Sequence, residues 1–190
     1  MNKIVGVVAL SLFVPCMAQA EMFAMLQSGP VSLGGGQYAF NYVLVLPGGE
    51  RLDPTATNGV TCRGASSTVV LCNPAGTFVT IYDIPGFVSS SASAAGWSAT
   101  NQFIGVTPSQ VNASPFDSPN AVNVTFAYTG PVVHAGSTDV TLSGFQITST
   151  LNGVNTAGHY SSQDTQDVSS SAGLTAQGVG SVQIPTAPTD

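Results

Sequence analysis

Charged side chains are scarce in this sequence. Asp, Glu, Lys and Arg together make up 6% of the residues, against roughly 25% in typical soluble proteins. The cations are Lys3, Arg51 and Arg63, whereas nine residues are acidic. Binding to nucleic acid or to anionic lipid depends on clustered Lys and Arg. The composition therefore excludes DNA and RNA as partners and argues against attachment to an anionic membrane surface.

A hydrophobic run long enough for a membrane helix, ~20 residues, is also lacking. A shorter apolar run at residues 4–14 follows Lys3, and an A-x-A pattern ends at Ala20. This order is typical of a signal peptide read by the general secretion pathway, with an uncleaved anchor or a buried helix as the alternative. We expect residues 1–20 to be removed, so that an exported chain without a membrane span begins at Glu21.

Cysteine and histidine are few. Cys16 lies within the predicted signal peptide and follows Pro15, where a lipoprotein would carry a small residue such as Gly or Ala. Cleavage leaves Cys62 and Cys72 in an exported chain, which predicts a disulfide, with two free thiols as the alternative. A zinc site needs about four ligands, and the two histidines have no spacing that would complete one. We therefore expect a structural disulfide and no zinc.

A long apolar stripe at helical spacing is absent, and Gly or Pro interrupts most candidate helices. The apolar residues instead recur with a period of two, which is typical of β-strands. Residues 122–128 alternate cleanly, and residues 38–46 are apolar on one face throughout and on both faces in their second half. That second half predicts a strand in the middle of a packed sheet. Further strands are expected at residues 68–71, 77–84, 97–106, 140–151, 159–165 and 178–184.

About eight short strands separated by turn signals predict an all-β fold: a single antiparallel β-sandwich, with a β-barrel as the alternative. The domain is expected to span residues 21–184 and to end in an exposed tail at 185–190. The small, polar runs at 89–95 and 169–176 are expected to be loops. The apolar parity of the strand at 140–151 switches beside a glycine, which predicts a β-bulge.

Residue types that carry catalytic chemistry show no recognisable pattern. His134 lies near the end of one expected strand and His159 at the start of another. Each could act as a base, although a surface or half-buried histidine with a local hydrogen bond is the commoner case. No serine stands in a G-x-S-x-G motif. We therefore expect no catalytic residue.

Acidic residues gather in two places. Asp164 and Asp167 offer oxygen ligands of the kind that calcium prefers, but they lack the D-x-D-x-D-G loop and are expected to form a solvated edge. Glu50, Arg51 and Asp53 are expected to form a surface ion pair and a turn. Calcium is therefore the one cofactor that the sequence leaves open.

Two aromatic residues are candidates for contact with carbohydrate. Aromatic faces stack on the C–H surfaces of sugar rings, and nearby amides bind hydroxyl groups. Trp97, with Asn101 and Gln102 close by, and Tyr160 fit this description. Trp97 also alternates with apolar residues of its strand, which indicates a place in the core.

Three stretches carry a resemblance to exported proteins of Gram-negative bacteria. They are GGERLDP at 48–54, CNPAGTF at 72–78 and VTFAYTG at 124–130. Together with the signal peptide and the Ser/Thr/Gly-rich, charge-poor β domain, they resemble the PEP-CTERM class. That class carries a Pro-Glu-Pro signal, an apolar helix and a basic cluster after the domain, whereas this chain ends at Pro188-Thr189-Asp190. The resemblance implies an anchorless member or a chain that stops before its tail, and it supplies no catalytic residue and no ligand.

Three functions remain in view. The first is a non-catalytic structural or adhesive domain, secreted or held at the outer envelope, that works in the bacterial envelope or extracellular matrix. Its expected partners are extracellular polysaccharide or other envelope components. The alternative is a carbohydrate-binding module, and the third is a secreted hydrolase whose site is assembled from residues far apart in the sequence.

Overall fold

The computed structural model describes residues 21–55, 61–63, 69–71, 76–113, 115–168 and 170–188, with the backbone alone at 61–63 and 69–71. These residues form thirteen β-strands and no helix, which confirms the all-β prediction. None of the described segments is a helix that could cross a membrane. The predicted signal peptide and Cys72 lie outside the described residues, so cleavage and the Cys62–Cys72 disulfide stay predictions.

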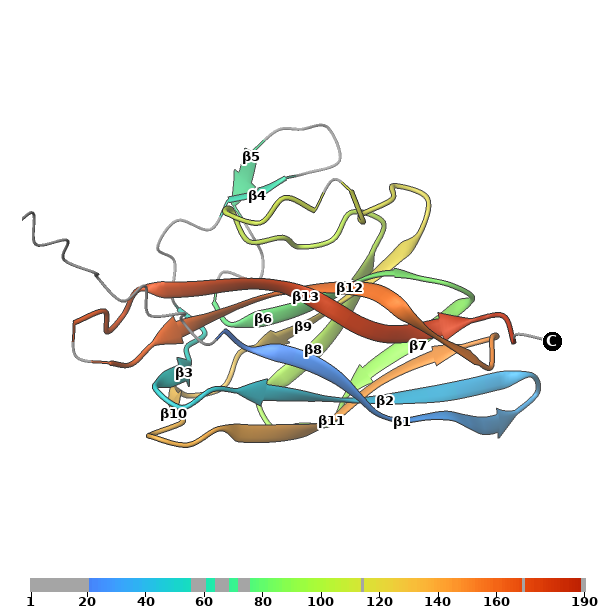
Figure 1. Cartoon of the computed structure of the whole chain (residues 1–190), viewed down its shortest axis with the longest axis horizontal. Helices are drawn as coiled ribbons and strands as arrows, with labels where there is room; N and C mark the ends of the chain where they lie inside the picture. Colours follow the sequence, from blue (N-terminus) through green and yellow to red (C-terminus); the bar gives the residue numbers. More distant parts are fainter. Residues whose placement is uncertain are drawn as a thin grey trace, which may run out of the picture.

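Two antiparallel sheets form the β-sandwich (Figure 1). The first sheet has the order β1-β2-β11-β7, with β1 at Phe23–Gly34, β2 at Gln37–Leu46, β11 at Val140–Ser149 and β7 at Phe87–Ala92. The second has the order β10-β3-β12-β6-β9-β8, with β13 also paired to β12. Its strands are β10 (Val133–His134), β3 (Glu50–Leu52), β12 (Gly153–Gln166), β6 (Phe78–Ile84), β9 (Val122–Tyr128), β8 (Trp97–Gln102) and β13 (Thr175–Thr186). A separate hairpin joins β4 (Thr61–Arg63) to β5 (Val69–Leu71).

The core lies between the sheets and is built from alternate side chains of the most regular strands. Phe40, Tyr42 and Leu44 of β2 are buried against Val124 and Phe126 of β9 in one cluster. Period-two alternation puts these side chains on the same face of their strand, which the other sheet then covers. The strands expected at 38–46 and 122–128 are therefore confirmed as the two walls of the core.

Two further expectations about the first sheet are confirmed. β2 is paired on both sides, to β1 and β11, and its outward-facing Val43 and Val45 are buried although they lie outside the core cluster. The register of β11 against β2 shifts between Leu142 and Phe145, as expected for a β-bulge. Gly144 sits in this bulge with φ 97°, a conformation that favours glycine.

The loop expected at residues 89–95 is wrong, because most of it belongs to β7. β7 pairs only with β11, at the edge of its sheet, and its outward side chains include the exposed Ser89 and Ser91. An edge strand of small polar residues carries no apolar alternation, which is the signal that predicts strands. β1 escapes prediction for a related reason: its pairing with β2 shifts register at three places, which breaks the period.

Strand ends also differ from the sequence-based expectation. The strand expected at 97–106 ends at Gln102, and the last strand begins at Thr175 and reaches Thr186. It therefore includes Pro185, which is buried rather than part of an exposed tail. β13 pairs with β12 alone among the described strands, and such an edge position tolerates proline.

The segment between β8 and β9, which the structure describes at residues 103–113 and 115–121, crosses the outer face of the second sheet. The Thr80 hydroxyl donates a hydrogen bond to the carbonyl of Val106 at 2.7 Å, and the Tyr82 hydroxyl lies 2.6 Å from both the Thr107 and Ser161 hydroxyls. The second sheet is thus covered on both faces over its centre.

Truncation of the core tests this architecture. Phe126→Ala should lower the free energy of unfolding by ~3–5 kcal/mol, because the fully buried ring leaves a cavity between the sheets. Phe103→Ala is the matched control, since the Phe103 side chain is 59% exposed, and it should change stability by less than about 1 kcal/mol. Urea unfolding measures both, and equal losses would contradict the core described above.

Candidate functional site

An ion-pair network occupies the surface beside β3. The Arg51 guanidinium contacts Asp53 Oδ2 at 3.0 Å and Asp167 Oδ1 at 3.5 Å, and His134 Nδ1 hydrogen-bonds to Asp167 Oδ2. The hydrogen bond from His134 lowers the pKa of Asp167 below its usual value. His134 is 57% exposed in its side chain, and exposed pairs of this kind contribute little stability. The expected ion pair between Arg51 and Asp53 is present, but Asp53 is buried rather than at the surface.

Glu50 and Asp164 depart from their expected surface positions. Asp164 is 1% exposed and Glu50 5% exposed, so the solvated edge expected at Asp164 is wrong. Residues 161–166 of β12 are all buried, because β12 is paired on both sides and packed on both faces. Alternation directs the side chain of Asp164 toward the first sheet, where Met22 N donates a hydrogen bond to its Oδ2 at 2.9 Å.

Burial leaves the carboxyl groups of Glu50 and Asp164, which we call the Glu50–Asp164 pair, with too few hydrogen-bond partners. Asp164 Oδ1 and Glu50 Oε2 are both enclosed and without a hydrogen bond from any described residue. Burial, followed by the charges of Asp167 and Glu21, raises the pKa of Glu50 to about 7. Burial and the Glu50 charge raise the pKa of Asp164 well above its usual value. No group of three or more Asp, Glu, His or Cys among the described residues could hold a metal ion, so calcium finds no support there.

The two aromatic candidates do not form an exposed platform. Trp97 is 8% exposed and packs in the core against Tyr128 and Phe145, with ring centroids 5.3 and 5.1 Å away. Contact between Trp97 and a sugar is therefore ruled out by its burial, and its place in the core is confirmed. Tyr160 is half-buried and covers Gly180 on the neighbouring strand, where an added Cβ would meet the tyrosine ring at 2.7 Å.

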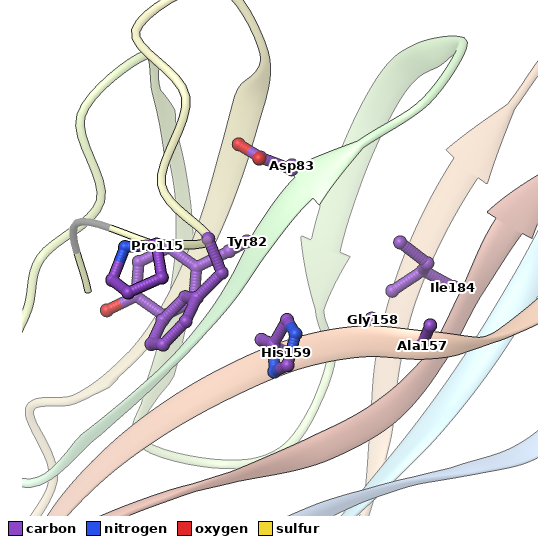
Figure 2. Close-up of a pocket in the computed structure, with 8 residues that line it drawn as sticks. Tyr82, Asp83, Pro115, Ala157, Gly158, His159 and Ile184 are labelled. Atoms are coloured by element: carbon purple, nitrogen blue, oxygen red, sulfur yellow. The ribbon is translucent and has the colours of Figure 1, made fainter. Parts of the chain in front are cut away.

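A small pocket of about 230 Å³ lies where the segment 103–121 meets β6, β12 and β13 (Figure 2). The Phe116 ring stacks on His159 at 4.7 Å between centroids and meets Tyr82 edge-on at 5.0 Å. Asp83 also lines the pocket, but its backbone N–H donates to Asn123 and its Oδ1 accepts from the Ser118 N–H. Pockets for ordinary ligands measure roughly 300–1,000 Å³, so this one is too small for a sugar ring with its neighbours.

The outer face of the first sheet is the broader candidate. The four strands β1, β2, β7 and β11 contain no Asp, Glu, Lys, Arg or His. Their pairing places Ser28, Asn41, Gln146 and Ser91 in one row across the sheet. Gln146 Nε2 donates to Asn41 Oδ1 at 2.9 Å, and Asn41 Nδ2 donates to Ser28 Oγ at 3.2 Å. The row is a ladder of amides and hydroxyls without any formal charge.

Apolar side chains continue this face beyond the ladder. Met25, which is 50% exposed, pairs with Val43, and Phe23 pairs with Val45. Val43 and Val45 are buried beneath their neighbours, so we call the ladder together with Phe23 and Met25 the uncharged face of the first sheet. The polar residues of this face were not identified from the sequence. Asn41 and Gln146 lie at alternate positions of expected strands, opposite in direction to the core residues, and this alternation is the signal that could have identified them.

Trp97 provides a spectroscopic test of its own placement. It is the one tryptophan in the sequence, so the intrinsic emission reports on it alone. We expect blue-shifted emission that acrylamide quenches weakly in the folded protein and strongly in urea, because the core shields the indole. Quenching as strong in the folded as in the unfolded protein would contradict the burial of Trp97.

Comparisons with known proteins do not assign either surface to a family. No protein-family model, no curated protein and no solved structure matches this chain. The functional argument therefore depends on the geometry and chemistry of the described residues.

Proposed function

We propose that this protein is an exported, non-catalytic structural or adhesive domain of the bacterial envelope or extracellular matrix. It binds a neutral partner, such as extracellular polysaccharide, through the uncharged face. The observation that carries the proposal is the complete absence of charged residues from the four strands of the first sheet, in a protein whose carboxylates number nine.

The chemistry of the face matches that of a neutral polymer. Polysaccharides present hydroxyl groups, which need donors and acceptors, and C–H surfaces, which need apolar contact. Asn41 and Gln146 supply amide donors and acceptors, Ser91 supplies a hydroxyl, and Met25 supplies an apolar surface. A charge at these positions would have to be desolvated on contact with a neutral partner, which is costly.

Two further predicted features of the chain agree with a function outside the cell. The predicted signal peptide provides export, and the predicted disulfide suits an oxidising compartment. The described carboxylates belong to the second sheet and the loops, and none of them stands on the four strands that form the uncharged face.

The other two functions have less support. The carbohydrate-binding module was motivated by Trp97 and Tyr160, and neither ring offers an open platform. A hydrolase needs a nucleophile with a base, or an acid and a base in a cleft. The Glu50–Asp164 pair is enclosed within the sandwich, and the His159 ring faces Phe116.

Charge introduced on the uncharged face tests the proposal. Asn41→Asp and Ser91→Asp should each weaken co-sedimentation with the neutral exopolysaccharide of the host, or with cellulose as a probe, by about tenfold, because the new carboxylate is desolvated without a partner. The matched controls Asn101→Asp on β8 and Ser181→Asp on β13 place the same changes on exposed positions of the second sheet. They should bind like the unmodified protein.

Several results would contradict the proposal. The unmodified protein could fail to bind neutral polymers, or all four variants could bind equally well while remaining folded by circular dichroism. Turnover of a glycoside, ester or peptide substrate that is lost in a folded His159→Ala or His134→Ala variant would favour the hydrolase instead.

A further inference from the structure

The buried Glu50–Asp164 pair lies beside the first residues of the predicted mature chain. β3 and β12 are neighbours, and Glu50 pairs with Gln166 in their register. β1 begins at the end of the sandwich where β3 lies (Figure 1). Two carboxyl oxygens of the pair, Asp164 Oδ1 and Glu50 Oε2, point into the interior without a hydrogen-bond partner among the described residues. Such atoms in a folded protein call for a donor.

The chain at Glu21 and Met22 is held firmly against β12. Met22 is fully buried, its N–H donates to Asp164 Oδ2 at 2.9 Å, and the Ser162 hydroxyl donates to its carbonyl. The Glu21 side chain lies over Gly178, where an added Cβ would come 2.5 Å from Glu21 Oε2. The α-nitrogen of Glu21 precedes the Met22 amide by one residue, so it lies within roughly 6 Å of the Asp164 carboxyl group.

We propose that cleavage after Ala20 creates the missing partner: the new α-ammonium of Glu21 pairs with the buried Glu50 and Asp164 carboxylates and completes the folded domain. Hydrolysis of the Ala20–Glu21 peptide bond converts an uncharged amide nitrogen into a primary amine, which takes up a proton. This inference rests on the predicted cleavage site and is independent of the proposed adhesive role.

Among the side chains that the structure describes, no cation forms an ion pair with Glu50 or Asp164. The charged groups nearby are the Glu21 carboxylate at the start of the chain, Glu50 on β3, and Asp164 and Asp167 at the end of β12. The Arg51 guanidinium contacts Asp53 and Asp167 through its terminal nitrogens, its Nε is enclosed without a hydrogen-bond partner among the described residues, and His134 of β10 contacts Asp167. A buried carboxylate without a counter-charge is costly, so in the uncut chain burial favours the protonated form of both carboxyl groups.

The pH dependence of the uncut chain follows from the raised pKa of Glu50. The folded protein binds the proton more tightly than the unfolded chain does, so the stability due to this group is full below its unfolded pKa and is lost as pH rises through about 7. The ammonium removes this loss, because it favours the charged carboxylates and is itself held protonated by them. Processing thus stabilises the exported chain at neutral pH relative to its precursor.

Selective acetylation of the α-amine tests the proposal. Lys3 is the one lysine in the sequence and belongs to the removed segment, so an amine-selective acetylating reagent modifies only the terminus of the chain 21–190. At pH 7 acetylation should raise the unfolding equilibrium constant in urea by about tenfold, equivalent to one pKa unit of interaction. The difference should vanish near pH 4, where the carboxyl groups are protonated, and in the Glu50→Gln, Asp164→Asn double variant.

Two further measurements keep the proposal testable if a variant fails to fold. The α-amine of the free chain should titrate above its ordinary pKa of about 7.7–8.0, and this shift should be lost in the single variant Asp164→Asn even if the double variant fails to fold. A chain that begins at Ala20 moves the ammonium by one residue and should behave like the acetylated protein. Equal unfolding of free and acetylated chains at pH 7, an unshifted α-amine, or an exported protein whose first residue is not Glu21 would each overturn the proposal.

Discussion

Six consecutive polar side chains of β12, residues 161–166, are buried, and distant segments of the fold give the first four of them hydrogen-bond partners. A polar group that is removed from water without a hydrogen bond costs several kcal/mol, so each of these residues constrains the chain around it. The segment 103–121, β6, β13 and the first residues of the mature domain all converge on this strand. Their contacts are Tyr82 with Ser161, Gly76 and Gln177 with Gln163, and Met22 with Ser162 and Asp164. Among these six residues, Asp164 Oδ1, Thr165 Oγ1 and Gln166 Oε1 are buried without a hydrogen-bond partner among the described residues, and Glu50 Oε2 on the neighbouring β3 is in the same state.

The two sheets divide the chemistry of the molecule. The second sheet and the loops carry the described Asp, Glu, Arg and His residues: Arg51, Asp53, His134 and Asp167 form ion pairs with one another, and Glu50 and Asp164 are enclosed in the interior. The first sheet carries none, and its outer face combines an amide and hydroxyl ladder with aliphatic side chains. A surface of this kind suits extended, neutral partners better than a compact ligand. The small pocket beside His159 is shaped by packing of Phe116 between Tyr82 and His159, which are structural contacts.

Much of the fold could be predicted from local pattern alone. Alternation at residues 38–46 and 122–128 identified the two central strands and their core faces, because the side-chain period of a strand is set by its backbone. The parity switch beside Gly144 identified the bulge for the same reason. Composition shows the scarcity of cations directly, whereas export and the exclusion of nucleic acid as a partner stay predictions from the first twenty residues and from composition.

The sites depended on the tertiary structure. Asp164 has the sequence surroundings of a solvated edge, and only the packing of distant segments on both faces of β12 buries it, with a donor 142 positions away at Met22. The ladder of the uncharged face is assembled from four strands, one of which, β7, looks like a loop in sequence. Sequence by itself determined where the regular, half-buried strands form, because alternation reflects the local backbone, whereas the polar edge strand β7 and the irregular β1 escaped it. Only the tertiary structure decided which polar residues are enclosed and which face outward together, because burial depends on what the rest of the chain brings alongside.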